Sequence, residues 1–203
     1  MKRLTLCIAT RNAHKLSEIR AVLSDLALEI TSTADHPGCP EVEEDGATLE
    51  ANAEKKAGAV CAFTGLLTLA DDTGLEVDAL DGAPGVLSAR YAGPGCSYSD
   101  NNAKLLRELA GVPEERRSAR FRCVIALADP TASGSLSLHE GRIDGRILRE
   151  PRGQGGFGYD PIFWVPEAGC SLAELPPDRK NSISHRARAL AAARVALKRR
   201  LEI

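Results

Sequence analysis

Two adjacent aspartates, Asp71 and Asp72, follow an apolar run and precede Thr73-Gly74. A second acidic run, Glu43-Glu44-Asp45, lies in a proline-containing segment with the composition of a loop. Carboxylates at the ends of strands can converge in a cleft, and Mg²⁺ in proteins is commonly held by one or two carboxylates together with substrate phosphates. The same residue types are also common in turns and on solvated surfaces. The acidic residues therefore allow a metal site without requiring one.

The run Thr10-Arg11-Asn12-Ala13-His14-Lys15 stands between an apolar segment and an amphipathic one, where a helix would begin. A helix N-terminus offers free N–H groups and the positive end of the helix dipole, which suit a phosphate. Thr10 and Asn12 can donate hydrogen bonds, and Lys15 adds a positive charge. The glycines of a Walker phosphate loop are missing. A simple N-cap by Asn12 beside a solvated lysine explains the same residues, so this run alone does not identify a phosphate site.

The segment 153–161, Gly-Gln-Gly-Gly-Phe-Gly-Tyr-Asp-Pro, contains four glycines within six residues. Such a density indicates close backbone approach or left-handed backbone conformations. Phe157 or Tyr159 could stack on a nucleobase. We interpret the segment as a binding loop because its composition is too constrained for a linker.

Basic residues gather near the start of the last predicted helix, at Lys180 and Ser184-His185-Arg186. Ser184 is a suitable N-cap. Cations at this end oppose the helix dipole, so their placement favours an anionic ligand or acceptor atoms on a base. Asn52 and Lys56 are four residues apart and share a helix face. Lys56 can reach a phosphate if that face is turned toward the site, and otherwise both residues lie on the surface.

Helices and strands mix without strict alternation along the 203 residues, which predicts a single α/β domain with a mixed sheet. The apolar patterns predict strands at 4–9, 28–32, 66–71, 75–80, 120–128 and 162–165, and one or two more within 136–148. They predict helices at 12–26, 48–63, 101–109 and 184–201.

The composition argues against several functional classes. A net charge of −2 and an aromatic content of 4% do not favour a nucleic-acid-binding module. No apolar run approaches the roughly 20 residues of a membrane-spanning helix. The six cysteines include no C-x-x-C pair, which is typical of reduced thiols in a cytoplasmic protein. We therefore expect a cytoplasmic protein that binds neither membrane nor nucleic acid.

Taken in order along the chain, these motifs resemble those of the Ham1/RdgB family, the inosine triphosphate or non-canonical purine nucleoside triphosphate pyrophosphatases. Each motif is weak alone, but the ordered set is specific and spans nearly the whole chain. The matching stretches are Thr10–Lys15, Glu43–Gly46 with Asn52 and Lys56, Leu69–Leu75, Gly82–Tyr91, Gly155–Pro161 and Lys180–Arg186.

The resemblance implies a long mixed β-sheet flanked by helices, with two lobes around a central cleft, and a homodimer. It also implies Mg²⁺-dependent hydrolysis of ITP, dITP and XTP to the monophosphate and pyrophosphate. A 6-oxopurine presents an acceptor where adenine presents a donor. Donors from His185, Arg186 or loop N–H groups would therefore favour hypoxanthine and xanthine over adenine.

The resemblance assigns Asp72, Lys15 and Lys56 to catalysis, with Asp72 as the base that activates water. It assigns Asp72 and Glu43 to the metal, with Glu44 as the alternative to Glu43. The implied substrate-binding residues are Thr10, Arg11, Asn12, Ala13, His14, Lys15, Thr73, Phe157, Gly158, Tyr159, Asp160, Lys180, His185 and Arg186. Arg11 departs from the family pattern, in which many members have glycine.

Two rival functions remain at this stage. One is a Maf-like pyrophosphatase that acts on pyrimidine or modified nucleotides. The other is a nucleotide-binding protein without catalytic activity. The pair of acidic positions and the accompanying lysines disfavour the second rival.

Overall fold

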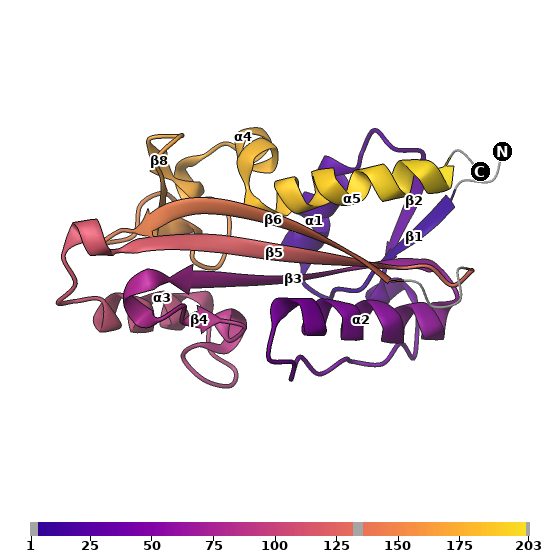
Figure 1. Ribbon diagram of the computed structural model, residues 1–203, viewed down its shortest axis with the longest axis horizontal. Helices are drawn as coiled ribbons and strands as arrows, with labels where there is room; N and C mark the ends of the chain where they lie inside the picture. The colour runs from indigo at the N-terminus through magenta and orange to yellow at the C-terminus, as the bar shows by residue number, and fades with distance from the viewer. Residues whose placement is uncertain (1–3, 132–135, 202–203) are drawn as a thin grey trace. The chain divides into compact units, whose positions relative to one another are not determined.

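The strands form one mixed sheet in the order β2-β1-β3-β5-β6-β7-β8, with β4 paired to β3 (Figure 1). The computed structural model describes residues 4–131 and 136–201. β1 pairs in parallel with β2 and β3, whereas β4, β7 and β8 join antiparallel to their neighbours. The strands are β1 (Leu4–Ile8), β2 (Leu28–Ser32), β3 (Leu67–Val77), β4 (Pro84–Gly85), β5 (Ser118–Ala128), β6 (Leu136–Ile147), β7 (Phe163–Val165) and β8 (Cys170–Ser171).

Within the described residues, five α-helices flank this sheet, which confirms the predicted α/β class with a mixed sheet. They are α1 (Ala13–Val22), α2 (Leu49–Thr64), α3 (Tyr98–Glu108), α4 (Pro177–Ile183) and α5 (His185–Leu201). No helix in the described ranges is long and apolar enough to cross a membrane.

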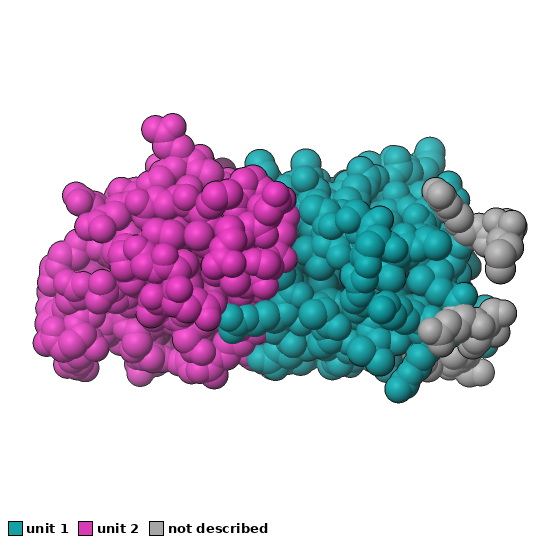
Figure 2. All heavy atoms as spheres, turned by 90° about the horizontal axis from the view of Figure 1, so that it is seen from above, with its two compact units in different colours: residues 1–72, 123–141, 186–203 teal, residues 73–122, 142–185 magenta. Residues whose placement is uncertain are grey.

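The chain divides into two compact units (Figure 2). Unit 1 contains the residues up to Asp72, residues 123–141 and the residues from Arg186 onward. Unit 2 contains residues 73–122 and 142–185. The strands β3, β5 and β6 each contribute residues to both units. The cleft expected between two lobes stays a prediction.

Unit 1 has its apolar core between the sheet and two helices, α1 and α5 (Figure 1). Leu190 and Leu197 of α5 pack there against Leu6 of β1 and Ile19 of α1. The helix α2 covers the other face of the sheet in this unit (Figure 1). The side chain of Thr48 caps the start of α2, and Gly65, with φ 66°, ends it in the left-handed conformation that glycine adopts without steric cost.

Unit 2 is built around a second apolar core that includes Phe121 of β5 and Phe163 of β7. Arg117 is fully buried beside this core. Its guanidinium donates to the carbonyls of Leu109, Ile147 and Leu148 at 2.6–2.8 Å. One side chain thus satisfies three carbonyls and fastens the end of α3 to the segment that leads into the glycine-rich loop.

Several predicted boundaries were wrong. The predicted strands at 66–71 and 75–80 form one strand, β3, because Asp71-Asp72-Thr73-Gly74 continues the strand instead of turning. Within 136–148, where one or two strands were predicted, residues 136–147 form one strand, β6. An unpredicted helix, α4, ends just before Ser184, and α5 begins at the residue after it, so Ser184 occupies the position before α5 that was predicted for an N-cap.

Candidate active site

Asp71 is the centre of a buried charge cluster in unit 1. Its Oδ1 lies 2.9 Å from Lys15 Nζ, and its Oδ2 accepts from Arg186 Nε at 3.0 Å and Nη2 at 2.9 Å. Arg186 also donates through Nη1 to Glu18 at 2.5 Å. Burial alone would raise the pKa of Asp71, but the charges of Lys15 and Arg186 outweigh it and hold the pKa well below its ordinary value. Asp71 is therefore an ionised structural carboxylate.

Asp72 has different partners, because successive residues of a strand point to opposite faces of the sheet. Its Oδ1 lies 3.2 Å from Lys56 Nζ, and its Oδ2 accepts from Asn52 Nδ2 at 3.2 Å. Burial raises the pKa of Asp72, and the negative charge of Glu44 adds to this, while Lys56 opposes it. A carboxylate with a raised pKa is a better proton acceptor than an ordinary aspartate, as a general base requires.

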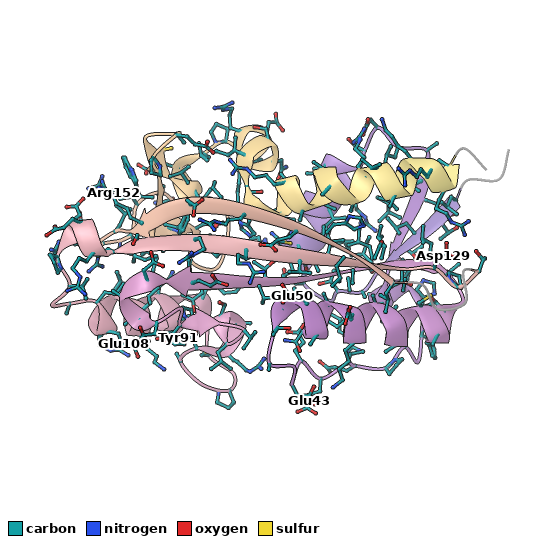
Figure 3. The ribbon with its side chains drawn as sticks, in the orientation of Figure 1. Glu43, Glu50, Tyr91, Glu108, Asp129 and Arg152 are labelled. Carbon is teal, nitrogen blue, oxygen red and sulfur yellow. The ribbon has the colours of Figure 1, made fainter. Side chains whose placement is uncertain are left out.

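Lys56 joins Asp72 to the acidic loop before α2. Its Nζ lies 2.5 Å from Glu44 Oε1 and donates to the main-chain oxygen of Asp71 at 2.7 Å. Glu43 is exposed and extends from the outer edge of this loop (Figure 3). The structure therefore brings Glu44, and not Glu43, to Asp72, because neighbouring loop residues point in different directions.

The predicted phosphate segment forms the entry to α1. Asn12 Oδ1 accepts from the N–H groups of His14 at 3.0 Å and Lys15 at 3.3 Å, and Asn12 N donates to Thr10 Oγ1. Two of the N–H groups expected to face a phosphate are thus used by the cap. Ala13 and His14 are exposed in the first turn, and the side chain of Lys15 reaches Asp71.

Arg11 turns toward the acidic loop. Its Nη2 donates to the carbonyl of Cys39 at 3.3 Å, and its Nη1 lies 3.6 Å from Glu41. Thr73 is half-buried and follows Asp72 along β3.

A second polar cluster lies in unit 2, where Asp160 and Lys180 are both buried. Lys180 Nζ lies 2.5 Å from Asp160 Oδ2, and the same oxygen accepts from Phe157 N at 2.8 Å. The ammonium also lies 4.7 Å from the centroid of the Phe157 ring. A Cβ on Gly156 would lie 2.1 Å from Asp160 Oδ2, so the loop requires glycine there. This cluster places a donor and an acceptor beside one aromatic face.

Two of the predicted base-binding rings are enclosed by other residues. Tyr159 is buried in the core of unit 2 and donates its hydroxyl to the carbonyl of Ser88 at 2.9 Å, so its ring offers no stacking surface. The His185 ring is buried and stacks on Phe121, with centroids 4.6 Å apart and planes at 16°. Phe157 is half-buried and remains the predicted ring best placed to stack on a base.

The glycine-rich loop is held to α3 by Asn102, whose Nδ2 donates to the carbonyl of Gly158 at 3.0 Å. A pocket of about 440 Å³ lies on this side of the loop, and its lining includes Tyr98, Phe157 and Gly158. Neither Asp160 nor Lys180 lines it. The polar pair that can read a base therefore lies outside this pocket.

Sequence reasoning missed Glu18, Asn102 and the structural role of Asp71. Glu18 and Lys15 are three residues apart and share a face of α1, which was an available signal. Asn102 makes its contact 56 residues away along the chain, and no local pattern reports such a pair.

Comparison with known proteins gives extended similarities. The sequence profile of the Ham1 family matches residues 6–196, which include every cluster described above. The chain is 56% identical over 186 residues to a dITP/XTP pyrophosphatase of Geobacter sulfurreducens, covering 92% of each protein. It is 55% identical over 185 residues to one of Desulforamulus reducens, covering 91% of each. A HAM1 protein of Coxiella burnetii has a similar structure, with a TM-score of 0.88 at 41% identity, covering 97% of this chain and 99% of that one.

Proposed function

Since the chain belongs to the Ham1 family, we propose that it hydrolyses ITP, dITP and XTP to the nucleoside monophosphate and pyrophosphate. The observation that carries the proposal is the placement of Asp72. This carboxylate has a raised pKa and lies 3.2 Å from Lys56, in the same cluster as Glu44. Relatives that are more than half identical to the chain are dITP/XTP pyrophosphatases.

In the proposed reaction, Asp72 orients a water molecule and accepts its proton as the oxygen attacks the α-phosphorus. The bond between the α-phosphorus and the bridging oxygen breaks, and pyrophosphate leaves. Phosphoryl chemistry of this kind depends on positioning and on charge stabilisation more than on covalent catalysis. Lys15 and Lys56 supply positive charge on either side of Asp71-Asp72, and they would stabilise the developing negative charge.

We propose Mg²⁺ as the cofactor, held by Asp72 and Glu44 in place of the predicted Glu43. The oxygen donors suit this hard cation, and the ammonium of Lys56 already bridges the two carboxylates, so the pair accommodates a positive charge. Within residues 4–131 and 136–201, no group of three or more His, Cys, Asp or Glu side chains could hold a metal. That agrees with a Mg²⁺ site completed by substrate phosphates. Bound there, Mg²⁺ would neutralise triphosphate charge.

Base selection is proposed to rest on Lys180 and Asp160 beside the Phe157 ring. An ammonium can only donate hydrogen bonds. It therefore suits the 6-oxo acceptor of hypoxanthine or xanthine and opposes the 6-amino donor of adenine. The sequence-based hypothesis gives this role to His185, Arg186 or N–H groups of the loop. Stacking on Phe121 occupies one face of the His185 ring, and two carboxylates, those of Asp71 and Glu18, hold the Arg186 guanidinium. Lys180 pairs with Asp160 and lies beside the ring of Phe157, the predicted ring best placed to stack on a base, so we propose Lys180 for this role.

We also propose a cytoplasmic homodimer. All six cysteines are free thiols, as a reducing compartment would keep them. Leu87 and Tyr98 of unit 2 are large apolar side chains that are 47% and 41% exposed, and a second copy could cover them. Light scattering coupled to size-exclusion chromatography tests this state, and a monomer at micromolar concentration would contradict it.

The function is tested by pyrophosphate release from ITP, dITP, XTP, GTP, ATP and dTTP, each with and without Mg²⁺. The proposal expects Mg²⁺-dependent release from the first three and little from the others. Release from dTTP alone would favour a Maf-like pyrophosphatase. Binding of ITP without any release would favour a nucleotide-binding protein.

A further inference from the structure

The amide of Asn52, in the first turn of α2, touches both parts of the proposed metal site. Asn52 is 1% exposed. Its Nδ2 donates to Asp72 Oδ2 at 3.2 Å, and its Oδ1 accepts from the main-chain N of Gly46 at 2.8 Å. Gly46 lies two residues after Glu44 in the acidic loop. One neutral side chain therefore connects the carboxylate of β3 to the loop that carries the other carboxylate.

We propose that Asn52 is a positioning residue that sets the placement of Glu44 relative to Asp72, and thereby the affinity of the site for a divalent cation. The inference rests on the proposed function, because it assumes that these two carboxylates bind the metal. Asn52 itself contributes no charge and need not touch the metal. It acts through the orientation of Asp72 and through the path of the loop.

The contact with the loop depends on glycine at position 46. A Cβ on Gly46 would lie 2.6 Å from Asn52 Oδ1, closer than such atoms approach in real structures. The φ angle of Gly46 is not in the left-handed region, so backbone conformation does not explain this glycine. Close approach of the Asn52 amide does explain it. The hydrogen bond from Gly46 N to Asn52 Oδ1 therefore requires both asparagine at position 52 and glycine at position 46.

The chemistry of the amide explains why asparagine fits this position. Its two ends must satisfy a carboxylate, which accepts, and a main-chain N–H, which donates, and an amide offers one donor group and one acceptor at a fixed separation. Aspartate would lose the donor and place a negative charge against Asp72. Lys56, one turn further along α2, bonds Asp72 Oδ1 and Glu44, so each oxygen of Asp72 has a partner on this helix.

The expected effect is on metal affinity. Groups that hold a metal ligand without touching the metal typically change metal affinity by about 10- to 100-fold when they are removed. We expect Asn52→Ala to raise the dissociation constant of the cation by an amount in this range. We expect Gly46→Ala to do the same from the loop side, because its methyl group displaces the amide. The double variant should show a loss smaller than the sum of the two, because both remove one contact.

The experiment measures Mn²⁺ binding by electron paramagnetic resonance of the free ion, with full-length protein and no nucleotide. The panel contains the wild type, Asn52→Ala, Gly46→Ala and the double variant. Asn101→Ala is the matched control. Asn101 is 2% exposed, lies in unit 2 on α3, and also bonds through both ends of its amide, to Ala92 N at 2.7 Å and to the carbonyl of Ala89 at 3.2 Å. It therefore reports the loss of stability that follows from removing a buried amide.

The inference is supported if Asn52→Ala and Gly46→Ala weaken Mn²⁺ binding non-additively while Asn101→Ala binds Mn²⁺ like the wild type. It is overturned if Asn52→Ala and Gly46→Ala bind Mn²⁺ as tightly as the wild type, or if Asn101→Ala weakens binding equally. Circular dichroism identifies any variant that fails to fold, and the other single variant then decides. A wild type that binds no Mn²⁺ would instead overturn the assumption that Asp72 and Glu44 hold the cation without nucleotide. The metal site completed by substrate phosphates is tested separately, by the Mg²⁺ dependence of ITP hydrolysis, which separates the two failures.

Discussion

Asp71 and Asp72 are adjacent in β3, yet their carboxylates serve different sets of partners. The carboxylate of Asp71 forms ion pairs with Lys15 and Arg186. The carboxylate of Asp72 forms an ion pair with Lys56 and accepts a hydrogen bond from Asn52. Their pKa values are shifted in opposite directions, below the ordinary value for Asp71 and above it for Asp72. The pair therefore separates into one structural carboxylate and one that can exchange a proton, and substitutions at the two positions should have different results.

Replacing Asp72 with asparagine should remove most of the activity and little of the stability. Loss of a general base lowers kcat by about 10²- to 10⁴-fold. Lys56 keeps Glu44 as a partner, so no buried cation is left alone. Stopped assays of pyrophosphate release from ITP measure the change, with thermal unfolding as the control for folding. A variant with the kcat of the wild type would exclude Asp72 from this role.

Replacing Asp71 with asparagine should instead destabilise the protein. Arg186 and Lys15 would each lose a carboxylate partner, and removal of one partner from a buried ion pair typically costs about 3–5 kcal/mol. Urea unfolding of Asp71→Asn against the wild type measures the loss. Asp45→Asn is a suitable control, because its ion pair with Lys55 is largely exposed and should contribute little. Equal stability of the two variants would contradict the structural role of Asp71.

Glu44 and Glu43 provide a matched pair for the proposed metal site. Glu44→Gln should raise the Mg²⁺ concentration needed for half-maximal activity, because it removes one of two carboxylate ligands. Glu43→Gln should leave that concentration unchanged, because Glu43 is exposed at the outer edge of the loop. Mg²⁺ titration of ITP hydrolysis compares the two variants. A larger effect at Glu43 would return the metal role to the residue first predicted.

Lys180→Gln should lower the preference for ITP over ATP. The ammonium donates wherever it binds, whereas a glutamine amide can also accept from the 6-amino group of adenine. Selectivity that depends on one polar group typically changes by about 10-fold or more. The ratio of kcat/KM for ITP and ATP measures it, and Arg179→Gln controls for the loss of charge, since Arg179 is the exposed neighbour. An unchanged ratio would remove Lys180 from base selection.

Cys7 should make the stability of the protein fall in alkaline solution. Burial raises the pKa of the Cys7 thiol from 9.0 to about 11. Above pH 9.0 the unfolded chain loses this proton while the folded chain keeps it, so the unfolded state binds fewer protons and the free energy of unfolding decreases until about pH 11. The loss reaches about 2 to 3 kcal/mol, since one pH unit of difference corresponds to about 1.4 kcal/mol.

Urea unfolding at pH 8 and pH 10.5 tests this effect in the wild type and in Cys7→Ala. The variant has no thiol at this position, so the difference in stability between the two proteins should shrink at the higher pH. A constant difference would show that the Cys7 thiol does not couple folding to protonation.

The sequence predicts local elements, such as single helices, better than contacts between residues that are far apart in the chain. Apolar periodicity predicted α1, α2, α5 and the mixed sheet, because these patterns repeat within a few residues. The ion pair of Asp71 with Arg186 joins residues 115 positions apart. No local pattern specifies such a pair. The Asp-Asp-Thr-Gly segment predicts a turn because these residue types are common in turns, whereas in the structure it continues the strand β3.

Lys180 shows a second kind of error. The sequence suggested that this lysine lies near a helix start, where its charge opposes the dipole. The structure places it in the last turn of α4, where a cation is favoured. Lys180 therefore belongs to a short helix, α4, that the apolar pattern of this proline-containing segment did not predict. Its burial against Asp160 depends on the tertiary structure, since the two residues are far apart in the sequence.

The division of the chain between the two units has a consequence for its synthesis on the ribosome. Every residue of unit 2 precedes Arg186, whereas the core of unit 1 includes α5, which follows all of unit 2 in the chain. Leu190 and Leu197 of that helix complete the apolar core around Leu6 and Ile19. As the chain emerges from the ribosome, Phe157 of the glycine-rich loop and Lys180 of α4 can make their contact before α5 is synthesised. The carboxylate of Asp71 in unit 1 gains its partner Arg186 only after every residue of unit 2 has been made.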